Sequence, residues 1–449
     1  MLPRNYPPHS GPRRGVLAAA LLAAVPGVAL SVPVDYEVGL SALHSDNLGM
    51  VETDPKPDTV LMPDLRFGIE QSGSTLSLRA GGVVQYVDYV DDTFDDGFRG
   101  ALSAQALWTL IPDRLQWTFE DYLSLQPIDS LAAFSPDNQQ QANLFVTGPT
   151  LLLRAGNATH GQVDMRYIRS YAQDNETFNG NRLGIAARLF HDFSTTSTLS
   201  ANVEAVDVKY DVLAPESEYT RYDAYGRYWR QLRDLETNID LGYSVIKYGG
   251  VRKDESLPLA RFSVNWQASP RSAVNLRLNY EFSDAAQNLI IDGFGTDGIG
   301  TEGIDTADID DATGNPSVPI GAGIYRQRGV QLGYQFTGGR LSFEVRPYYL
   351  RLDYLQLSAQ NEEDWGCYSA LSYKIRPRLN LQLAAAIADR KFEGPVRKYR
   401  DTTASIALEN SFTAHWVGRV ELQRRERDSP IIGQDYKENV AILSFTYRR

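Results

Sequence analysis

The chain has 449 residues and a formal net charge of −12 at pH 7, with 44 Lys and Arg against 56 Asp and Glu. This acidic balance argues against a general nucleic-acid binder, and the polar overall hydropathy argues against a bundle of membrane helices. Cys367 is the single cysteine, so neither an intrachain disulfide nor a cysteine-rich metal site can form.

The N-terminal residues predict an export signal. A basic segment with Arg13 and Arg14 precedes the apolar, alanine-rich stretch 15–30, which ends in small residues typical of a cleavage site. We therefore expect residues 1–31 to be a signal peptide that is removed, leaving a single domain of residues 32–449. The apolar stretch is too short to be a convincing membrane anchor.

Apolar and polar residues alternate through most of the remaining chain. In chain order, strands are expected at 35–42, 61–70, 76–90 and 98–110, and the series continues to 443–447. The stretch 257–283 is the clearest hairpin, because two alternating runs flank a Ser-Pro-Arg turn at 269–271. Each run alternates for about ten residues, the length that a tilted strand needs to cross a bilayer.

Short and long breaks between these strands alternate strictly. The short breaks fall near residues 73, 114, 157, 194, 234, 270, 338, 377 and 413. The longer, more polar breaks fall at 46–58, 91–96, 127–141, 171–179, 211–218, 249–256, 286–322, 355–364, 392–398 and 428–436. This predicts an all-β fold, a transmembrane antiparallel up-and-down β-barrel of about 20 strands (18–20), with short periplasmic turns and long extracellular loops.

In two stretches the apolar parity changes partway. Within 199–210 the apolar set passes to Val206, Val208 and Tyr210, and 239–248 shows the same change. We interpret both changes as the level at which a strand leaves the membrane, with a β-bulge as the alternative.

Charged residues on the polar parity are expected to face the lumen. Arg277 and Glu281 lie close along one strand, as do Arg419 and Glu421, so these pairs could form a structural network or a charged constriction. In 219–231, aromatic and Arg side chains share a parity, which would suit a carbohydrate path or a girdle strand. The predicted substrate path comprises Tyr225, Arg227, Trp229, Arg261, Arg277, Glu281, Arg346, Arg419 and Glu421.

The longest break, 287–322, is Gly-rich and acidic. We expect a mobile, solvated outer loop, with folding into the pore or Ca²⁺ binding as alternatives, although no EF-hand spacing is present. Its acidic residues are Asp292, Asp297, Glu302, Asp305, Asp308, Asp310 and Asp311.

The sequence gives little support to an enzyme. His44, His160, His191 and His415 remain after signal removal, and no nucleophile elbow, zinc motif or phosphate loop is present. We therefore predict no catalytic residues, no metal and no cofactor, and keep a barrel-borne enzyme as a remote alternative.

Three stretches carry a resemblance to a known family: the opening strand that ends at Asp46-Asn47, the spaced tyrosines of 219–230, and the alternating strands that follow. The chain resembles the outer-membrane family called β-barrel porin 2, found in gene clusters for exopolysaccharide synthesis or exosortase systems. The resemblance implies a bacterial outer-membrane channel for exopolysaccharide export or assembly. Its partners would be outer-membrane lipid, polysaccharide and periplasmic export components, with no nucleic acid. The alternative is a general or solute-selective diffusion porin.

Overall fold

The structure is a computed structural model that describes residues 34–154, 156–212, 217–249, 252–294, 320–356, 360–393 and 397–449. The predicted signal peptide lies outside these residues and stays a prediction. Side chains are described except for those of residues 290–294 and 397.

Nearly all of the described chain is β-sheet, as the alternation predicts. The first ten strands are β1 (Val34–Ser45), β2 (Asp58–Ser72), β3 (Leu76–Tyr89), β4 (Gly97–Ile111), β5 (Leu115–Pro127), β6 (Gln139–Arg154), β7 (Thr159–Ala172), β8 (Gly180–Ser194), β9 (Ser197–Tyr210) and β10 (Tyr219–Gln231). The other ten are β11 (Leu235–Tyr248), β12 (Glu255–Ser269), β13 (Ser272–Asp284), β14 (Ile324–Thr337), β15 (Leu341–Tyr354), β16 (Glu362–Arg376), β17 (Leu379–Phe392), β18 (Arg397–Ser411), β19 (Trp416–Asp428) and β20 (Tyr436–Arg448).

Three short helices lie between strands in the described residues. They are η2 (Pro136–Asn138), η3 (Glu176–Phe178) and α1 (Ala285–Phe294). No helix in the described part of the chain is long and apolar enough to span a membrane.

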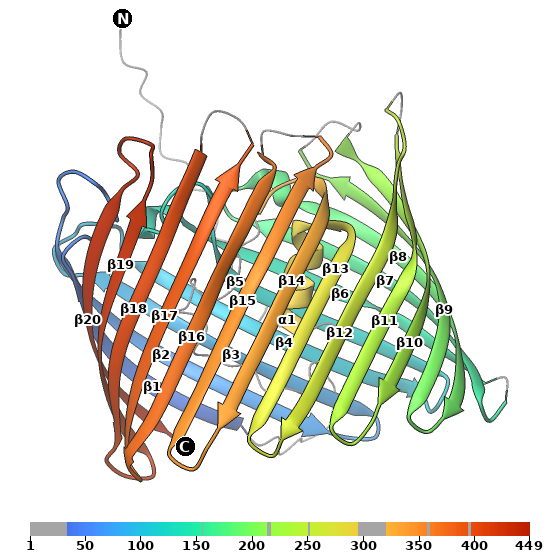
Figure 1. Cartoon of the computed structure of the whole chain (residues 1–449), viewed down its shortest axis with the longest axis horizontal. Coiled ribbons are helices and arrows are strands. Elements are labelled where there is room, and N and C mark those ends of the chain that lie inside the picture. Colours follow the sequence, from blue (N-terminus) through green and yellow to red (C-terminus); the bar gives the residue numbers. More distant parts are fainter. Residues whose placement is uncertain are drawn as a thin grey trace, which may run out of the picture. The chain divides into compact units, whose positions relative to one another are not determined.

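The strands form one closed antiparallel barrel. Each strand pairs with its neighbours in the chain, and β1 also pairs with β20, from Glu37 opposite Arg448 to Ser45 opposite Val440. The short turns gather at the barrel end that holds the C-terminus, and the long loops lie at the other end (Figure 1). The predicted count of about 20 strands and the sorting of the breaks are confirmed.

Two hydrogen bonds to the Asp46 carboxylate connect β1 and β20 at the loop end, in the seam where the barrel closes. The backbone N–H of Asn439 donates to Asp46 Oδ1 at 2.8 Å, and Asn439 Nδ2 donates to Asp46 Oδ2 at 2.6 Å. Burial acts to raise the pKa of the Asp46 carboxyl, but these hydrogen bonds hold that pKa below its usual range. The carboxylate is therefore charged at neutral pH, and the seam keeps both bonds.

The outer wall exposes large apolar side chains at alternate positions. On β11, Leu241 and Tyr243 are 63% and 51% exposed, whereas Asp240, the residue before Leu241, is 2% exposed. The polar parity therefore faces the interior, as the sequence predicts.

Near the loop end the apolar parity inverts. Val208, Tyr210, Ile246 and Tyr248 are buried in one interior cluster, while Lys209 between the first two is exposed outside. Residue pairing through β9 and β11 is continuous at these positions, so the β-bulge alternative is wrong. The change in pattern marks the level at which the outer surface turns polar and the interior becomes apolar.

Candidate functional site: the barrel lumen

Helix α1 begins directly after β13 and folds into the barrel. Asp284, the last residue of β13, caps the helix, because its Oδ1 accepts a hydrogen bond from the backbone N–H of Gln287 at 2.9 Å. Asn288 adds a second anchor by donating to the hydroxyl of Tyr325 at 2.8 Å. The predicted loop 287–322 therefore starts as a helix rather than as irregular chain.

The apolar face of α1 packs against a distant part of the wall. Ala285, Ala286 and Leu289 share one buried cluster with Leu144 and Val146, which point inward from β6. Since β6 lies far from β13 around the ring, α1 crosses the interior between two walls (Figure 1). Of the predicted acidic residues, Asp292 lies within α1 with its side chain outside the description, and the other six lie outside the described residues.

A second segment also crosses the interior. The loop between β5 and β6 reaches the opposite wall, where the hydroxyl of Tyr399 on β18 donates to the Ser130 carbonyl at 3.1 Å. Arg427 on β19 donates to the Leu131 carbonyl at 3.2 Å, and its guanidinium lies 4.0 Å from the centre of the Tyr399 ring. This loop and α1 together narrow the loop end of the lumen.

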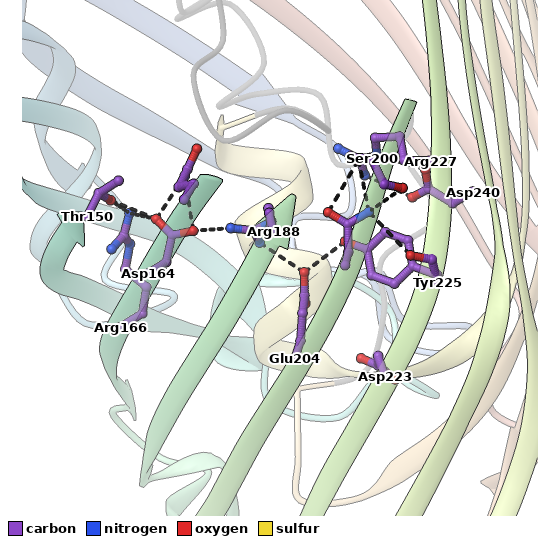
Figure 2. Close-up of polar contacts among 12 residues, drawn as sticks. Thr150, Asp164, Arg166, Arg188, Ser200, Glu204, Asp223, Tyr225, Arg227 and Asp240 are labelled. Carbon is purple, nitrogen blue, oxygen red and sulfur yellow. Dashed lines mark hydrogen bonds and ion pairs between the residues drawn. The ribbon is translucent and has the colours of Figure 1, made fainter. Parts of the chain in front are cut away.

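On the side of α1 that faces the turn end of the barrel, side chains of alternating charge lie on seven neighbouring strands. We call this set the lumen ladder, and it comprises Asp164, Arg188, Glu204, Tyr225, Arg227, Asp240, Arg261 and Glu281. Figure 2 shows the part from Asp164 to Asp240, with the side chains pointing toward one another. Each strand from β7 to β13 contributes at least one member.

The contacts within the lumen ladder are short. Arg188 Nη2 lies 2.9 Å from Glu204 Oε1, which also accepts a hydrogen bond from the Tyr225 hydroxyl at 2.8 Å. Arg261 joins two carboxylates, with Nη1 at 3.3 Å from Asp240 and Nη2 at 2.6 Å from Glu281. Because the carboxylates are nearly buried, each needs such a partner to offset the loss of hydration.

The lumen ladder is joined to α1 by one side chain. Gln287 Nε2 donates to Glu281 Oε2 at 3.3 Å, and Gln287 Oε1 accepts from Arg221. The position of the helix is therefore coupled to the charges on the wall.

Two predicted path residues, Tyr225 and Trp229, are engaged by charged side chains. Tyr225 is 7% exposed, and the guanidinium groups of Arg227 and Arg261 lie 5.9 and 5.5 Å from its ring centre. Trp229 donates its indole N–H to Glu236 at 3.2 Å. A sugar could stack on the Tyr225 ring only by displacing these guanidinium groups.

The predicted charge pairs have different outcomes. The pairing of Arg419 with Glu421 is confirmed at 2.8 Å. The pairing of Arg277 with Glu281 is wrong, because Glu281 is engaged by Arg261 from the neighbouring strand. Side chains on neighbouring strands lie closer together than side chains four residues apart on one extended strand, which are separated by two repeats of the pleat. Arg346 lies 3.0 Å from Glu344 on its own strand.

Other buried ion pairs were not predicted. Arg182 lies 3.4 Å from Asp284, which accepts a hydrogen bond from the Tyr219 hydroxyl at 2.6 Å. Arg390 lies 3.1 Å from Asp364. Arg182 shares the parity of Arg188, so the lumen-facing pattern could have identified it.

The histidines lie at strand ends or turns, as expected. His160 is 3.6 Å from Asp192, His191 is 3.0 Å from the Thr159 hydroxyl, and His44 is 3.1 Å from the Thr59 hydroxyl. In the part of the chain that the structure describes, no group of three His, Cys, Asp or Glu side chains could hold a metal ion.

Comparisons with known proteins give structural likeness only. No protein-family model and no curated protein matches the sequence. Pseudomonas aeruginosa OpdK, solved with vanillate, is 9% identical with a TM-score of 0.39, covering 93% of this chain and 99% of its own. The FrpB iron transporter of Neisseria meningitidis is 11% identical with a TM-score of 0.46, covering 96% and 83%. Acinetobacter baumannii OccAB4 is 8% identical with a TM-score of 0.37, covering 93% and 98%.

These likenesses are too distant to transfer a function, so we argue function from the barrel itself. The predicted barrel architecture is confirmed by the structure, and the link to exopolysaccharide gene clusters stays a prediction.

Proposed function

We propose that the chain is an outer-membrane barrel through which small hydrophilic solutes diffuse. Its closed wall leaves no strand edge to be satisfied in lipid, and its outer surface is apolar at alternate positions. Its inner surface carries paired charges and amides that suit a wet lumen.

The crossing by α1 is the observation that favours small solutes over a polymer. The helix lies between β13 and β6, held by apolar packing at one side and by Gln287 at the other. A polysaccharide would have to displace these contacts to pass, whereas a small solute needs a much narrower passage. The exopolysaccharide role thus has less support than the diffusion porin.

The test is reconstitution of the purified full chain. In planar bilayers we expect discrete conductance steps, and in liposome swelling we expect arabinose to enter faster than a large oligosaccharide. A protein that is folded by its heat-modifiable gel mobility yet gives neither conductance nor swelling would contradict the proposal. Equal entry of sugars of all sizes would contradict the narrowing by α1.

The membrane placement predicts a stability difference between two substitutions to arginine. Leu241→Arg puts a charge on the apolar outer wall and should lower the unfolding free energy in lipid vesicles by about 2–4 kcal/mol. Asp207→Arg also lies on the outer face but at the polar loop end, where it breaks an exposed ion pair with Lys209 at 3.5 Å, and should cost at most about 1 kcal/mol. Urea titrations of both variants in vesicles measure this difference, and equal costs would place Leu241 outside the bilayer.

A further inference from the structure

The lumen cations form two groups that differ in their partners. Six lumen arginines that pair with a carboxylate have side chains about one-third exposed or less: Arg166 and Arg188 at 26%, Arg227 at 31%, Arg261 at 27%, Arg346 at 30% and Arg419 at 31%. Arg277 is different, because it is exposed and, among the described residues, no carboxylate lies within ion-pair distance of it.

Arg277 belongs to the lumen-facing parity of β13. It shares that parity with Glu281, which is buried inside the lumen ladder, whereas Leu278 on the other parity is exposed on the outer wall. Arg277 lies nearer the turn end of β13 than Glu281 does, and so lies away from the strand end where α1 begins. Its guanidinium is therefore available to a solute in the part of the lumen nearer the turns.

The neighbours of Arg277 are neutral and polar. The residues paired with it are Ser263 on β12 and Gln331 on β14, so neither adjacent strand places an acid directly opposite. Asn275 and Asn279 flank it on its own lumen-facing parity. Their side chains lie over Gly333 and Gly329 of β14, where any larger residue would meet them.

We propose that Arg277, with the amides of Asn275, Asn279 and Gln331, binds the carboxylate group of anionic solutes that pass through the lumen. This rests on the proposed diffusion function and names the solute class it favours. A guanidinium presents a planar fork of N–H donors that matches the two oxygens of a carboxylate. The neighbouring amide N–H groups add donors without the charge that would repel an anion.

The experiment compares benzoate with the neutral sugar arabinose in liposome swelling, using the full chain. Arg277→Gln should lower the ratio of the benzoate rate to the arabinose rate several-fold. Arg277→Lys should give an intermediate benzoate rate, because an ammonium keeps the charge but loses the fork. Arg233→Gln is the matched control, since it removes the same charge from a turn residue that is 94% exposed.

The outcomes separate this site from the proposed function. If the wild type admits neither benzoate nor arabinose, the diffusion function fails. If it admits both, and Arg277→Gln keeps the same ratio of rates as Arg233→Gln, the carboxylate site alone is overturned. A Lys variant that is indistinguishable from the wild type would contradict bidentate binding.

Discussion

Replacing Leu289 with Asp is expected to raise the single-channel conductance several-fold. Leu289 is 7% exposed in the apolar cluster that holds α1 against β6. Burying a carboxylate there without a partner costs several kcal/mol, whereas the leucine contributes about 1.5–3 kcal/mol by its burial. The helix should therefore leave the far wall and widen the loop end of the lumen. Conductance steps in planar bilayers measure the change.

The control for this experiment is Leu289→Met, which conserves volume and should keep the wild-type conductance. Heat-modifiable mobility shows whether the Asp variant still forms a closed barrel. A folded Asp variant with wild-type conductance would show that α1 does not limit the flow.

Replacing Arg261 with Ala should destabilise the barrel more than any other single truncation in the lumen ladder. It leaves Glu281, with a side chain 5% exposed, without its ion-pair partner, whereas Asp240 keeps Arg227 at 2.7 Å. Removing one partner from a buried ion pair costs about 3–5 kcal/mol, because the remaining charge stays buried and unpaired. The midpoint of a urea titration in vesicles measures the loss.

Two further variants test whether an unpaired buried carboxylate causes this loss of stability. Arg277→Ala removes an exposed lumen arginine that has no carboxylate partner, and should change stability by at most about 0.5 kcal/mol. Arg261→Met combined with Glu281→Gln removes the cation together with the carboxylate that would be left unpaired, while Asp240 keeps Arg227, and should recover much of the loss. If this double variant is as unstable as Arg261→Ala, lost packing and not unpaired charge is responsible.

The alternation of apolar and polar residues along the chain was enough to predict the strands of the barrel wall and their two faces. A strand shows its two faces through a period of two, so Leu241 outside and Asp240 inside follow from neighbouring residues alone. The same reasoning located the turns, because short polar breaks such as 270–271 interrupt the pattern. The parity change at Val206 was also visible, although its cause was not.

Contacts across the lumen could not be predicted in this way. The choice of Arg261 rather than Arg277 as the partner of Glu281 depends on the stagger between β12 and β13, which no single strand records. Leu289 and Leu144 come from elements that meet only once the ring has closed. The apolar stretch after Asp284 could have suggested a helix, but not the wall on which it packs.

The sequence by itself thus determined a closed barrel with about 20 strands, an apolar exterior and a charged interior, because these follow from periodicity and from the spacing of breaks. The tertiary structure decided how the interior is used. Ring closure brings β6 opposite β13, so α1 can cross between them, and strand stagger pairs the lumen-ladder charges while leaving Arg277 free of a carboxylate among the described residues. The first depends on strands that are remote in the chain, and the second on the register between neighbouring strands, which the sequence of one strand alone does not fix.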